Sequence, residues 1–347
     1  MTFRDIAGHR RLKRLLTRAV QSGSLPPSLI FAGPDGVGKR QVALALAQAL
    51  NCLNPVIDSD GGHRDACGTC ASCGKIARGL HPDVRLVQSE DGGTITIGEV
   101  RDVIGQTAYR PFEGRSRAVI IDQADLLGED AQNALLKTLE EPPARNVFVL
   151  VTSRPSLLLT TVRSRCCVLR FAPLAAGEVA SELVARHGYG EREAQQAAAL
   201  AGGSLARAIE AGTLGPEDVR AVAMGVLAEA VHAPDARARL AVGAALLKSS
   251  ARKGKDREGK GQADRGSLAA CLRAMGSLLR DMTVLTTRAP DAALVNLDLR
   301  ADLEPLARRY DRDRLGRAFS AVGRSLVALE RHNASSKIVV DWLALQL

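Results

Sequence analysis

The chain has 347 residues, of which 46% are hydrophobic and 24% charged, a composition typical of a globular protein with room for two or three domains. No stretch reaches the roughly 18 to 20 apolar residues that a membrane helix needs, and the N-terminus carries no apolar signal core. We therefore expect a cytoplasmic protein with no membrane contact. The net charge of +9 favours an acidic partner such as nucleic acid, although an arginine-rich soluble protein would carry the same charge. Because only 3% of residues are aromatic, contact with a phosphate backbone fits better than base stacking.

Short apolar runs alternate with helical patterns in the first half of the chain, which predicts an α/β domain with a parallel sheet over residues 1–172. We expect its buried strands at residues 29–32, 84–87, 118–121, 147–151 and 168–171. A helix should follow the first strand, and another should cover the apolar positions between Ala131 and Leu139 and end before two prolines.

The strand patterns stop after this region, so the second half is expected to be all helical. Helical periodicity at residues 178–187, 191–201 and 204–211 predicts a small helical domain over 173–213. The helical pattern of residues 214–347 predicts a further helical domain. Within it, the highly charged segment 249–267 has almost no apolar residue and is predicted to be a mobile loop.

A phosphate-binding loop is predicted directly after the first strand. Residues 33–39 read Gly-Pro-Asp-Gly-Val-Gly-Lys, which fits the G-x-x-x-x-G-K pattern between a strand and a helix. Gly33, Gly36 and Gly38 would let backbone N–H groups turn toward phosphate oxygens, and Lys39 and the helix N-terminus would add positive potential.

Two residues depart from what such a site needs in order to hydrolyse ATP. The residue after Lys39 should be Ser or Thr, which binds Mg²⁺, but it is Arg40. Asp122 ends a strand and could hold Mg²⁺ through water, but Gln123 stands where a glutamate would activate the attacking water. Losing a general base typically removes about 10²–10⁴ in rate. The sequence therefore predicts no independent ATPase activity and a damaged Mg²⁺ site, and leaves open whether ATP binds at Lys39.

Four cysteines cluster in residues 52–73. Cys67, Cys70 and Cys73 have C-x₂-C-x₂-C spacing, and Cys52 lies upstream. In a reducing compartment such a cluster favours metal over disulfides, and four thiolates suit a tetrahedral, structural Zn²⁺. The other cysteines, at positions 166, 167 and 271, are expected to be buried apolar residues.

Two further motifs carry a family resemblance. Residues 133–143 read Asn-Ala-Leu-Leu-Lys-Thr-Leu-Glu-Glu-Pro-Pro, and residues 164–166 read Ser-Arg-Cys. Together with the phosphate loop and the cysteine insertion, they resemble the bacterial DNA polymerase III clamp-loader family, in particular its gamma/tau and delta-prime types. The resemblance covers nearly the whole chain and is sharpest from about residue 3 to 171.

The resemblance implies an AAA+ fold with a zinc-binding insertion, a small helical lid at 173–213 and a helical collar at 214–347 that builds a pentameric ring. In that family the Ser-Arg-Cys arginine enters a neighbour's ATP site, and here it is Arg165. It would neutralise charge on the transferred phosphoryl group, an effect worth about 10³–10⁵ in rate. Thr152 falls at the family's first sensor, and Arg207 at its second, with a spacing closer to the delta-prime type.

The implied partners are the gamma/tau and delta subunits of the ring, the sliding clamp and primer-template DNA, within the DNA polymerase holoenzyme. A gamma/tau-type motor subunit is the alternative within the family, but it would need Ser or Thr at position 40 and Glu at position 123. A free-standing P-loop DNA-dependent ATPase with a zinc module, or a kinase, would need its own base and Mg²⁺ ligands. A zinc-dependent DNA-binding module would leave Arg165 and the 133–143 string unexplained. The delta-prime type is therefore favoured.

Overall fold

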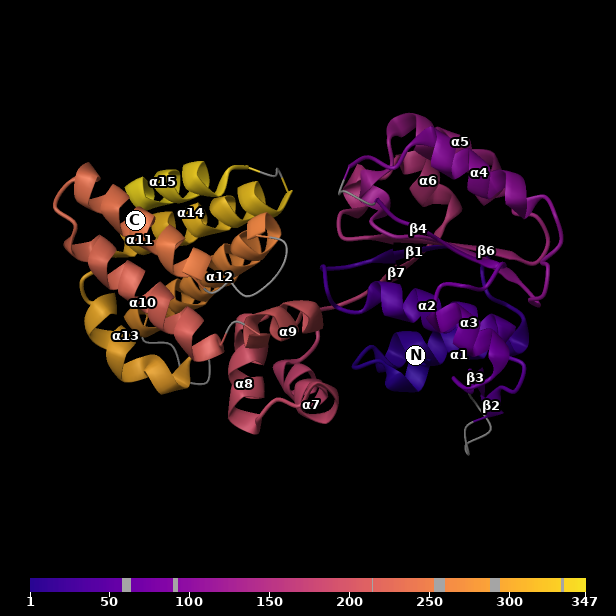
Figure 1. The fold of residues 1–347 in the computed structure, drawn as a ribbon, viewed down its shortest axis with the longest axis horizontal. Coiled ribbons are helices and arrows are strands. Elements are labelled where there is room, and N and C mark those ends of the chain that lie inside the picture. Colours follow the sequence, from indigo (N-terminus) through magenta and orange to yellow (C-terminus); the bar gives the residue numbers. More distant parts are fainter. Residues whose placement is uncertain (58–63, 90–92, 214, 253–259, 288–293, 332–333) are drawn as a thin grey trace. The chain divides into compact units, whose positions relative to one another are not determined.

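The computed structural model describes the chain except for residues 58–63, 90–92, 214, 253–259, 288–293 and 332–333 (Figure 1). The chain forms two compact units, Met1–Glu178 and Val179–Leu347. Among the described residues, no helix combines the length and the apolar character that crossing a membrane requires.

The first unit is built on a five-stranded sheet with the strand order β4-β5-β6-β1-β7, in which every pair is parallel. The strands are β1 (Ser28–Ala32), β4 (Val84–Val87), β5 (Arg117–Ile121), β6 (Asn146–Thr152) and β7 (Cys167–Arg170). All five predicted strands are confirmed to within one residue at either end. Strands β1, β5 and β6 are buried at every residue, as expected for parallel strands covered on both faces.

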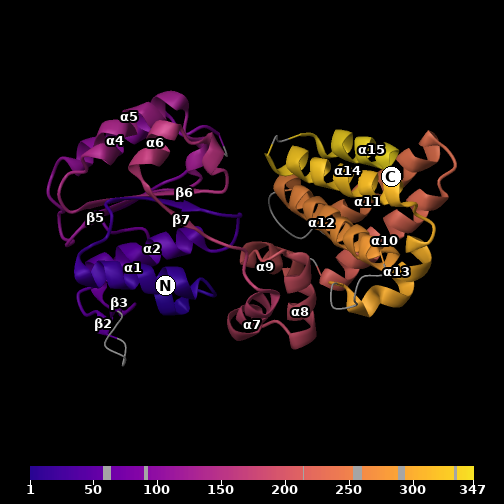
Figure 2. The same cartoon turned by 180° about the vertical axis from the view of Figure 1, so that it is seen from behind.

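Helices cover both faces of this sheet (Figures 1 and 2). One face carries α1 (Arg10–Ser22), α2 (Lys39–Asn51) and α3 (Ala71–Ala77), and the other carries α4 (Ile97–Thr107), α5 (Glu129–Glu140) and α6 (Thr160–Arg165). On the first face Leu16 and Leu46 pack with Phe31 of β1. On the second face Leu135 packs with Ile30 of the same strand. The successive residues of β1 thus supply two separate cores, because neighbouring side chains of a strand point to opposite faces.

The cysteine insertion forms a small structure of its own between α2 and β4. A two-stranded antiparallel hairpin, β2 (Val56–Ile57) and β3 (Arg64–Asp65), is followed by α3. Asp65 accepts hydrogen bonds from the backbone N–H groups of Phe3 and Arg4, so the hairpin also holds the N-terminal segment. The sequence did not predict this hairpin.

The described residues of the second unit form helices joined by turns and contain no strand, as predicted. Its helices are α7 (Ala176–His187, which begins in the first unit), α8 (Glu191–Leu200), α9 (Leu205–Thr213), α10 (Pro216–His232), α11 (Ala236–Arg252), α12 (Lys260–Thr286), α13 (Arg300–Ala307), α14 (Arg312–Arg331) and α15 (Ser336–Gln346). Its core gathers around α12, where Met275, Leu278 and Met282 are fully buried. The division into a lid at 173–213 and a collar at 214–347 stays a prediction.

The mobile loop predicted at 249–267 has the wrong boundaries. Helix α11 continues to Arg252 and α12 begins at Lys260, so residues 253–259 alone lie outside the described part. The charged residues in these flanks are Lys, Arg and Asp, which a long helix tolerates at modest cost. Ser267, at the end of the predicted loop, is buried in the helical core. Polar composition alone therefore overestimated the length of the loop.

Candidate nucleotide and metal sites

The phosphate loop has a backbone that requires its glycines. Gly36 and Gly38 have φ angles of 73° and 99°, in the left-handed region that other residues adopt at a cost. Gly33 has no such angle, but a Cβ there would lie 2.3 Å from the carbonyl oxygen of Phe171. The three predicted glycines thus shape the turn that joins β1 to α2.

This turn presents an unpaired row of donors. In the part of the chain that the structure describes, the backbone N–H groups of residues 38–41 have no hydrogen-bond partner. The Lys39 side chain is buried within the loop, where its Nζ donates to the carbonyl oxygens of Gly33 at 2.7 Å and Pro34 at 2.6 Å. Burial lowers the pKa of Lys39, while Asp35 and Asp122 oppose that shift. Free N–H groups, a helix N-terminus and a buried ammonium together make a site suited to an anion such as a phosphate.

Arg40 changes the metal chemistry of this site. Its Nη1 lies 3.6 Å from Oδ2 of Asp122, which follows strand β5. Burial raises the pKa of Asp122, and the Arg40 guanidinium partly offsets that effect. A guanidinium has no lone pair for a metal ion and repels one. Mg²⁺ therefore does not fit the residues present here, because its hydroxyl ligand is missing and its carboxylate is paired with an arginine.

Gln123 stands beside Asp122 in a left-handed conformation, with a φ of 51°. Its backbone N–H donates to Oδ1 of Asp122 at 3.0 Å. A neutral amide cannot take a proton from water at physiological pH. The residues at this end of the sheet can thus bind an anion, but they supply neither the metal site nor the general base that hydrolysis needs.

Thr152, the predicted first sensor, belongs to a cluster that the sequence did not indicate. Its Oγ1 donates to Oδ1 of Asp125 at 2.8 Å, and Nε of Arg154 donates to Oδ2 of the same carboxylate, also at 2.8 Å. Thr152 is buried, and Asp125 is neutralised by Arg154. Asp125 could have been noticed, because it lies three residues after Asp122, but nothing in the sequence pairs it with residues after β6.

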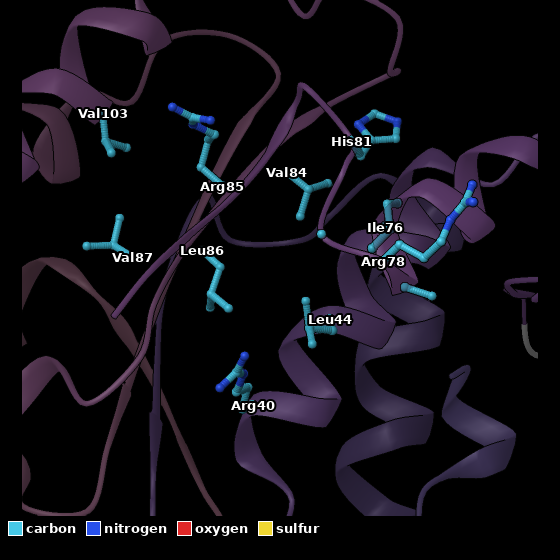
Figure 3. A pocket seen from close by; sticks show the side chains of 12 residues that line it. Arg40, Leu44, Ile76, Arg78, His81, Val84, Arg85, Leu86, Val87 and Val103 are labelled. Carbon is cyan, nitrogen blue, oxygen red and sulfur yellow. The ribbon is translucent and has the colours of Figure 1, made fainter. Parts of the chain in front are cut away.

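A cavity of about 540 Å³ opens beside the start of α2 (Figure 3). Arg40 and Leu44 line it from α2, and Leu86 and Val87 line it from β4, the edge strand of the sheet. Arg85 is a further arginine of its lining. Arg40 thus contributes both to the phosphate-loop region, through Asp122, and to this cavity.

Arg165, the predicted arginine finger, is the last residue of helix α6, which covers the sheet on the face opposite to α2 (Figure 1). Its Nε and Nη2 both lie 2.9 Å from Oε2 of Glu140, the last residue of α5, and its Nη1 donates to the carbonyl oxygen of Thr161 at 3.1 Å. The side chain is 31% exposed. Glu140 belongs to the 133–143 string, but its pairing with Arg165 could not be predicted from the sequence.

Arg207, the predicted second sensor, lies on α9 in the second unit. Its Nη2 lies 3.8 Å from Oε2 of Glu330 on α14. Arg273 on α12 is paired with the same Glu330 and with Glu210 of α9. Arg207 thus belongs to an ion-pair network among these helices, and its sensing role stays a prediction.

The four clustered cysteines converge, as predicted. The sulfur atoms of Cys52, Cys67, Cys70 and Cys73 all lie within 4.8 Å of one another. The Cys52 sulfur is 3.6 Å from that of Cys67 and 4.0 Å from that of Cys70. A tetrahedral Zn²⁺ with Zn–S bonds of about 2.3 Å would place its sulfurs about 3.8 Å apart. The arrangement can therefore bind a metal ion.

The local backbone favours thiolate at this cluster. The N–H groups of Cys67, Cys70 and Cys73 each point to the sulfur of the preceding cysteine of the set, at 3.2, 3.3 and 3.5 Å. The backbone N–H of Thr69 is the largest influence on Cys67 and, with the other hydrogen bonds there, lowers the pKa of Cys67 to about 6. Burial raises the pKa of Cys52 and Cys73. A bound metal ion would have to deprotonate these two thiols, because only the thiolate form is a ligand. Metal binding at this cluster therefore depends on pH.

The remaining cysteines are only partly as predicted. Cys271 is buried in the helical core and Cys166 is half-buried, but Cys167 is exposed. Cys167 lies on β7, the edge strand at the other end of the sheet, where one face is not fully covered. The expectation that Cys167 is buried was therefore wrong.

Comparisons with known proteins agree with this geometry. Residues 8–175 match the family described as "DNA polymerase III, delta subunit". DNA polymerase III subunit tau of Salmonella typhimurium is 32% identical over 182 residues, and subunit delta' of Bacillus subtilis is 34% identical over 174 residues. Residues 8–175, about half of the chain, are thus similar to a DNA polymerase III clamp-loader subunit family. The resemblance drawn from the 133–143 string and the Ser-Arg-Cys motif is confirmed.

The family match lies in the first half of the chain. The alignment with the tau subunit covers 52% of this chain and 27% of tau, and the alignment with the delta' subunit covers 50% of each. The chain thus spans half or less of the length of these curated relatives. A crystal structure of a DNA polymerase III gamma subunit-related protein from Thermotoga maritima covers 97% of each chain at 19% identity, with a TM-score of 0.47, which is too low to support an argument.

Proposed function

We propose that this chain is a delta-prime-type subunit of a bacterial DNA polymerase III clamp loader. In this proposal it joins gamma/tau and delta subunits in a cytoplasmic pentameric ring that places the sliding clamp on primer-template DNA during replication. It supplies Arg165 to the ATP site of a neighbouring motor subunit and does not hydrolyse ATP alone. The observation that carries the proposal is the ion pair between Arg40 and Asp122, beside Gln123, in an otherwise well-formed phosphate loop.

Hydrolysis by a P-loop enzyme needs Mg²⁺ on the phosphates and a group that orients or deprotonates water. In this chain the Mg²⁺ position is next to a guanidinium, and the basic carboxylate is replaced by an amide. Losing the base alone costs about 10²–10⁴ in rate, or roughly 3–5 kcal/mol of barrier. A family member with both defects fits a supporting position in the ring better than a motor position.

Arg165 has the features that donation to a neighbour requires. It is the last residue of a short surface helix, and its side chain is partly exposed. Nε and Nη1 of Arg165 donate to Glu140 and Thr161, and Nη2 is ion-paired with Glu140, so part of the guanidinium's five N–H groups stays available for an incoming phosphate. An arginine supplied in trans is worth about 10³–10⁵ in the rate of phosphoryl transfer.

A gamma/tau-type motor is the nearest alternative. The identities to a tau and to a delta' subunit are similar, at 32% and 34%, so overall similarity does not separate the two types. Residues 40 and 123 do separate them, because a motor needs a hydroxyl at the first and a carboxylate at the second.

The four cysteines are proposed to hold a structural Zn²⁺. All four coordination positions would be filled by protein sulfur, which leaves no open position for a substrate. The ion would fix the hairpin β2–β3 and α3 against the end of α2, where Cys52 lies.

The arginine is tested by Arg165→Ala in a loader reconstituted with its partner subunits. We expect the clamp- and DNA-stimulated hydrolysis at the neighbouring site to fall by about 10³-fold or more, because the charge on the transferred phosphoryl group is no longer neutralised. Arg163→Ala is the matched control, since Arg163 is exposed on the same turn of α6. Equal rates for the wild type and Arg165→Ala would remove the arginine finger from the proposal.

The purified chain alone tests the proposal that this subunit does not hydrolyse ATP by itself. We expect no measurable ATP turnover in the presence of Mg²⁺. Turnover at the rate of a motor subunit, abolished by Lys39→Ala, would instead assign the chain to the gamma/tau type.

A further inference from the structure

The phosphate loop is intact although its metal site is lost. Its glycines adopt the required conformations, and Lys39 is buried inside it. The backbone N–H groups of residues 38–41 have no partner among the described residues. Unpaired backbone donors carry a cost unless water or an anion satisfies them.

Mg²⁺ is the group that the loop cannot accommodate. In P-loop ATPases the ion neutralises part of the polyphosphate charge and is held by a hydroxyl and by an aspartate. Here the hydroxyl position is Arg40, whose guanidinium is paired with that aspartate, Asp122, at 3.6 Å. A divalent cation brought to Asp122 would have to displace the guanidinium or lie beside it.

We propose that the phosphate loop binds a nucleoside polyphosphate as the metal-free anion, with the guanidinium of Arg40 supplying the positive charge that Mg²⁺ supplies elsewhere. The proposal goes beyond the proposed function and does not depend on Arg165. It assigns to this chain a nucleotide that is held and not hydrolysed.

The chemistry of Arg40 suits this role. Its guanidinium has five N–H groups in a planar fork that matches phosphate oxygens, and it stays charged at any physiological pH. Asp122 is its one ionic partner among the described residues, so part of the fork stays available. The Arg40 side chain is 43% exposed and is not locked in the core.

The charges around the loop are consistent with an anion. Lys39 and Arg40 are the cations, and Asp35, Asp122 and Asp125 are the nearby acids, of which Asp125 is paired with Arg154. Asp35 is 64% exposed and its oxygen lies 3.9 Å from Nζ of Lys39, so water screens its charge strongly. Gln123 adds no negative charge where an active ATPase carries a glutamate. The anion therefore meets one acid fewer than in an active site.

The test measures binding of fluorescent mant-ATP and mant-ADP to the purified full chain, once with EDTA and once with excess Mg²⁺. For the wild type we expect binding in EDTA that is as tight as in Mg²⁺ or tighter. For Arg40→Ser we expect binding in EDTA to weaken about tenfold, because a charge-assisted hydrogen bond is lost. We also expect Mg²⁺ to restore that loss, since the introduced hydroxyl and the carboxylate of Asp122 then offer oxygen ligands to the ion.

Two further variants test whether a change in nucleotide affinity is due to Arg40 itself or to any loss of positive charge near the loop. Arg85→Ser removes an exposed arginine that lines the same cavity as Arg40 but is not paired with Asp122, and it should leave both affinities unchanged. Lys39→Ala should abolish binding in both conditions. The Mg²⁺ comparison on the wild type needs no variant, so a poorly folded substitution cannot hide the answer.

The proposal is overturned if wild-type binding tightens about tenfold or more with Mg²⁺, or if the wild type binds neither nucleotide in EDTA. It is also overturned if Arg40→Ser and the wild type respond to Mg²⁺ alike. Because these measurements use the isolated chain, a failure here leaves the Arg165 test in the reconstituted loader unaffected.

Discussion

Two candidate metal positions lie in the same unit of this protein. One has a full set of ligands and the other does not. The cysteine cluster keeps four convergent sulfur ligands, all within 4.8 Å of one another. The end of the phosphate loop keeps one carboxylate, Asp122, and places an arginine against it. The first position is closed and suits an ion that stabilises structure, while the second would have to exchange ligands in every catalytic cycle.

The difference shows which parts of an ATPase fold this chain retains. The glycine turn, the parallel strands and the cysteine insertion are all present. Positions 40 and 123 lack the hydroxyl and the carboxylate that turnover needs. The proposed role, which is to support a ring and donate Arg165, depends on this fold and not on turnover.

The largest expected effect is on the cysteine cluster. A structural Zn²⁺ contributes on the order of 10 kcal/mol of folding free energy in small zinc modules. Cys70→Ser should therefore abolish the binding of about one Zn per chain and lower the free energy of unfolding by at least about 3 kcal/mol. Metal analysis and urea unfolding provide the two measurements.

Cys167→Ser is the matched control for this prediction, because Cys167 is exposed on β7 and has no part in the cluster. It should keep the metal and the stability. If Cys70→Ser and Cys167→Ser unfold alike, the two metal positions do not differ as described.

An intermediate effect is expected from restoring the catalytic residues. The double variant Arg40→Thr/Gln123→Glu brings back a hydroxyl and a general base, so its ATP turnover should exceed that of Arg40→Thr alone by about 10²-fold, the lower end of general-base contributions. Turnover is measured with Mg²⁺ against the single variants, neither of which completes the site. A double variant as inactive as the wild type would show that further parts of the site are missing.

The smallest effect is expected from Asp122→Asn. Burial raises the pKa of this carboxyl in the folded protein, so the folded state binds its proton more tightly than the unfolded state does. As the pH rises above about 4, the wild type must give up that proton and loses stability relative to Asp122→Asn. Because Arg40 offsets part of the shift and is partly exposed, the gain at neutral pH should stay below about 1 kcal/mol.

Urea unfolding of both proteins from pH 4 to pH 7 measures this difference. Asp102→Asn, on an exposed residue of α4, serves as the control and should show no such trend. A variant less stable than the wild type across the whole range would mean that the Arg40–Asp122 pair stabilises the fold.

The strands and the long helices could be predicted because their local patterns are strong. Strands such as β5 and β6 are continuous apolar runs, and α5 has a clear helical period bounded by two prolines. Hairpin β2–β3 was missed because its strands have two residues each and carry no periodicity. The 249–267 segment was misjudged because charged residues favour a loop by composition but do not prevent helix formation at the ends of α11 and α12.

The candidate sites divide in the same way. Lys39 and the four cysteines stand in motifs with short, fixed spacings. The sequence therefore predicts that the lysine binds phosphate and that the cysteines bind a metal ion. The side-chain partners of the site residues could not be predicted from the sequence. Glu140 pairs with Arg165, 25 positions away, and Asp125 after β5 binds Thr152 and Arg154 at the end of β6. Such pairs depend on which strands lie side by side.

The sequence by itself determined the fold class, the family, the glycine turn and the two substitutions that argue against hydrolysis, because each depends on residues close together in the chain. Only the tertiary structure decided that the guanidinium of Arg40 faces Asp122 and that the four sulfurs converge. Those distances depend on how α2 packs against β5 and how the insertion closes on the end of α2, and packing of that kind joins residues whose separation along the chain carries no local signal.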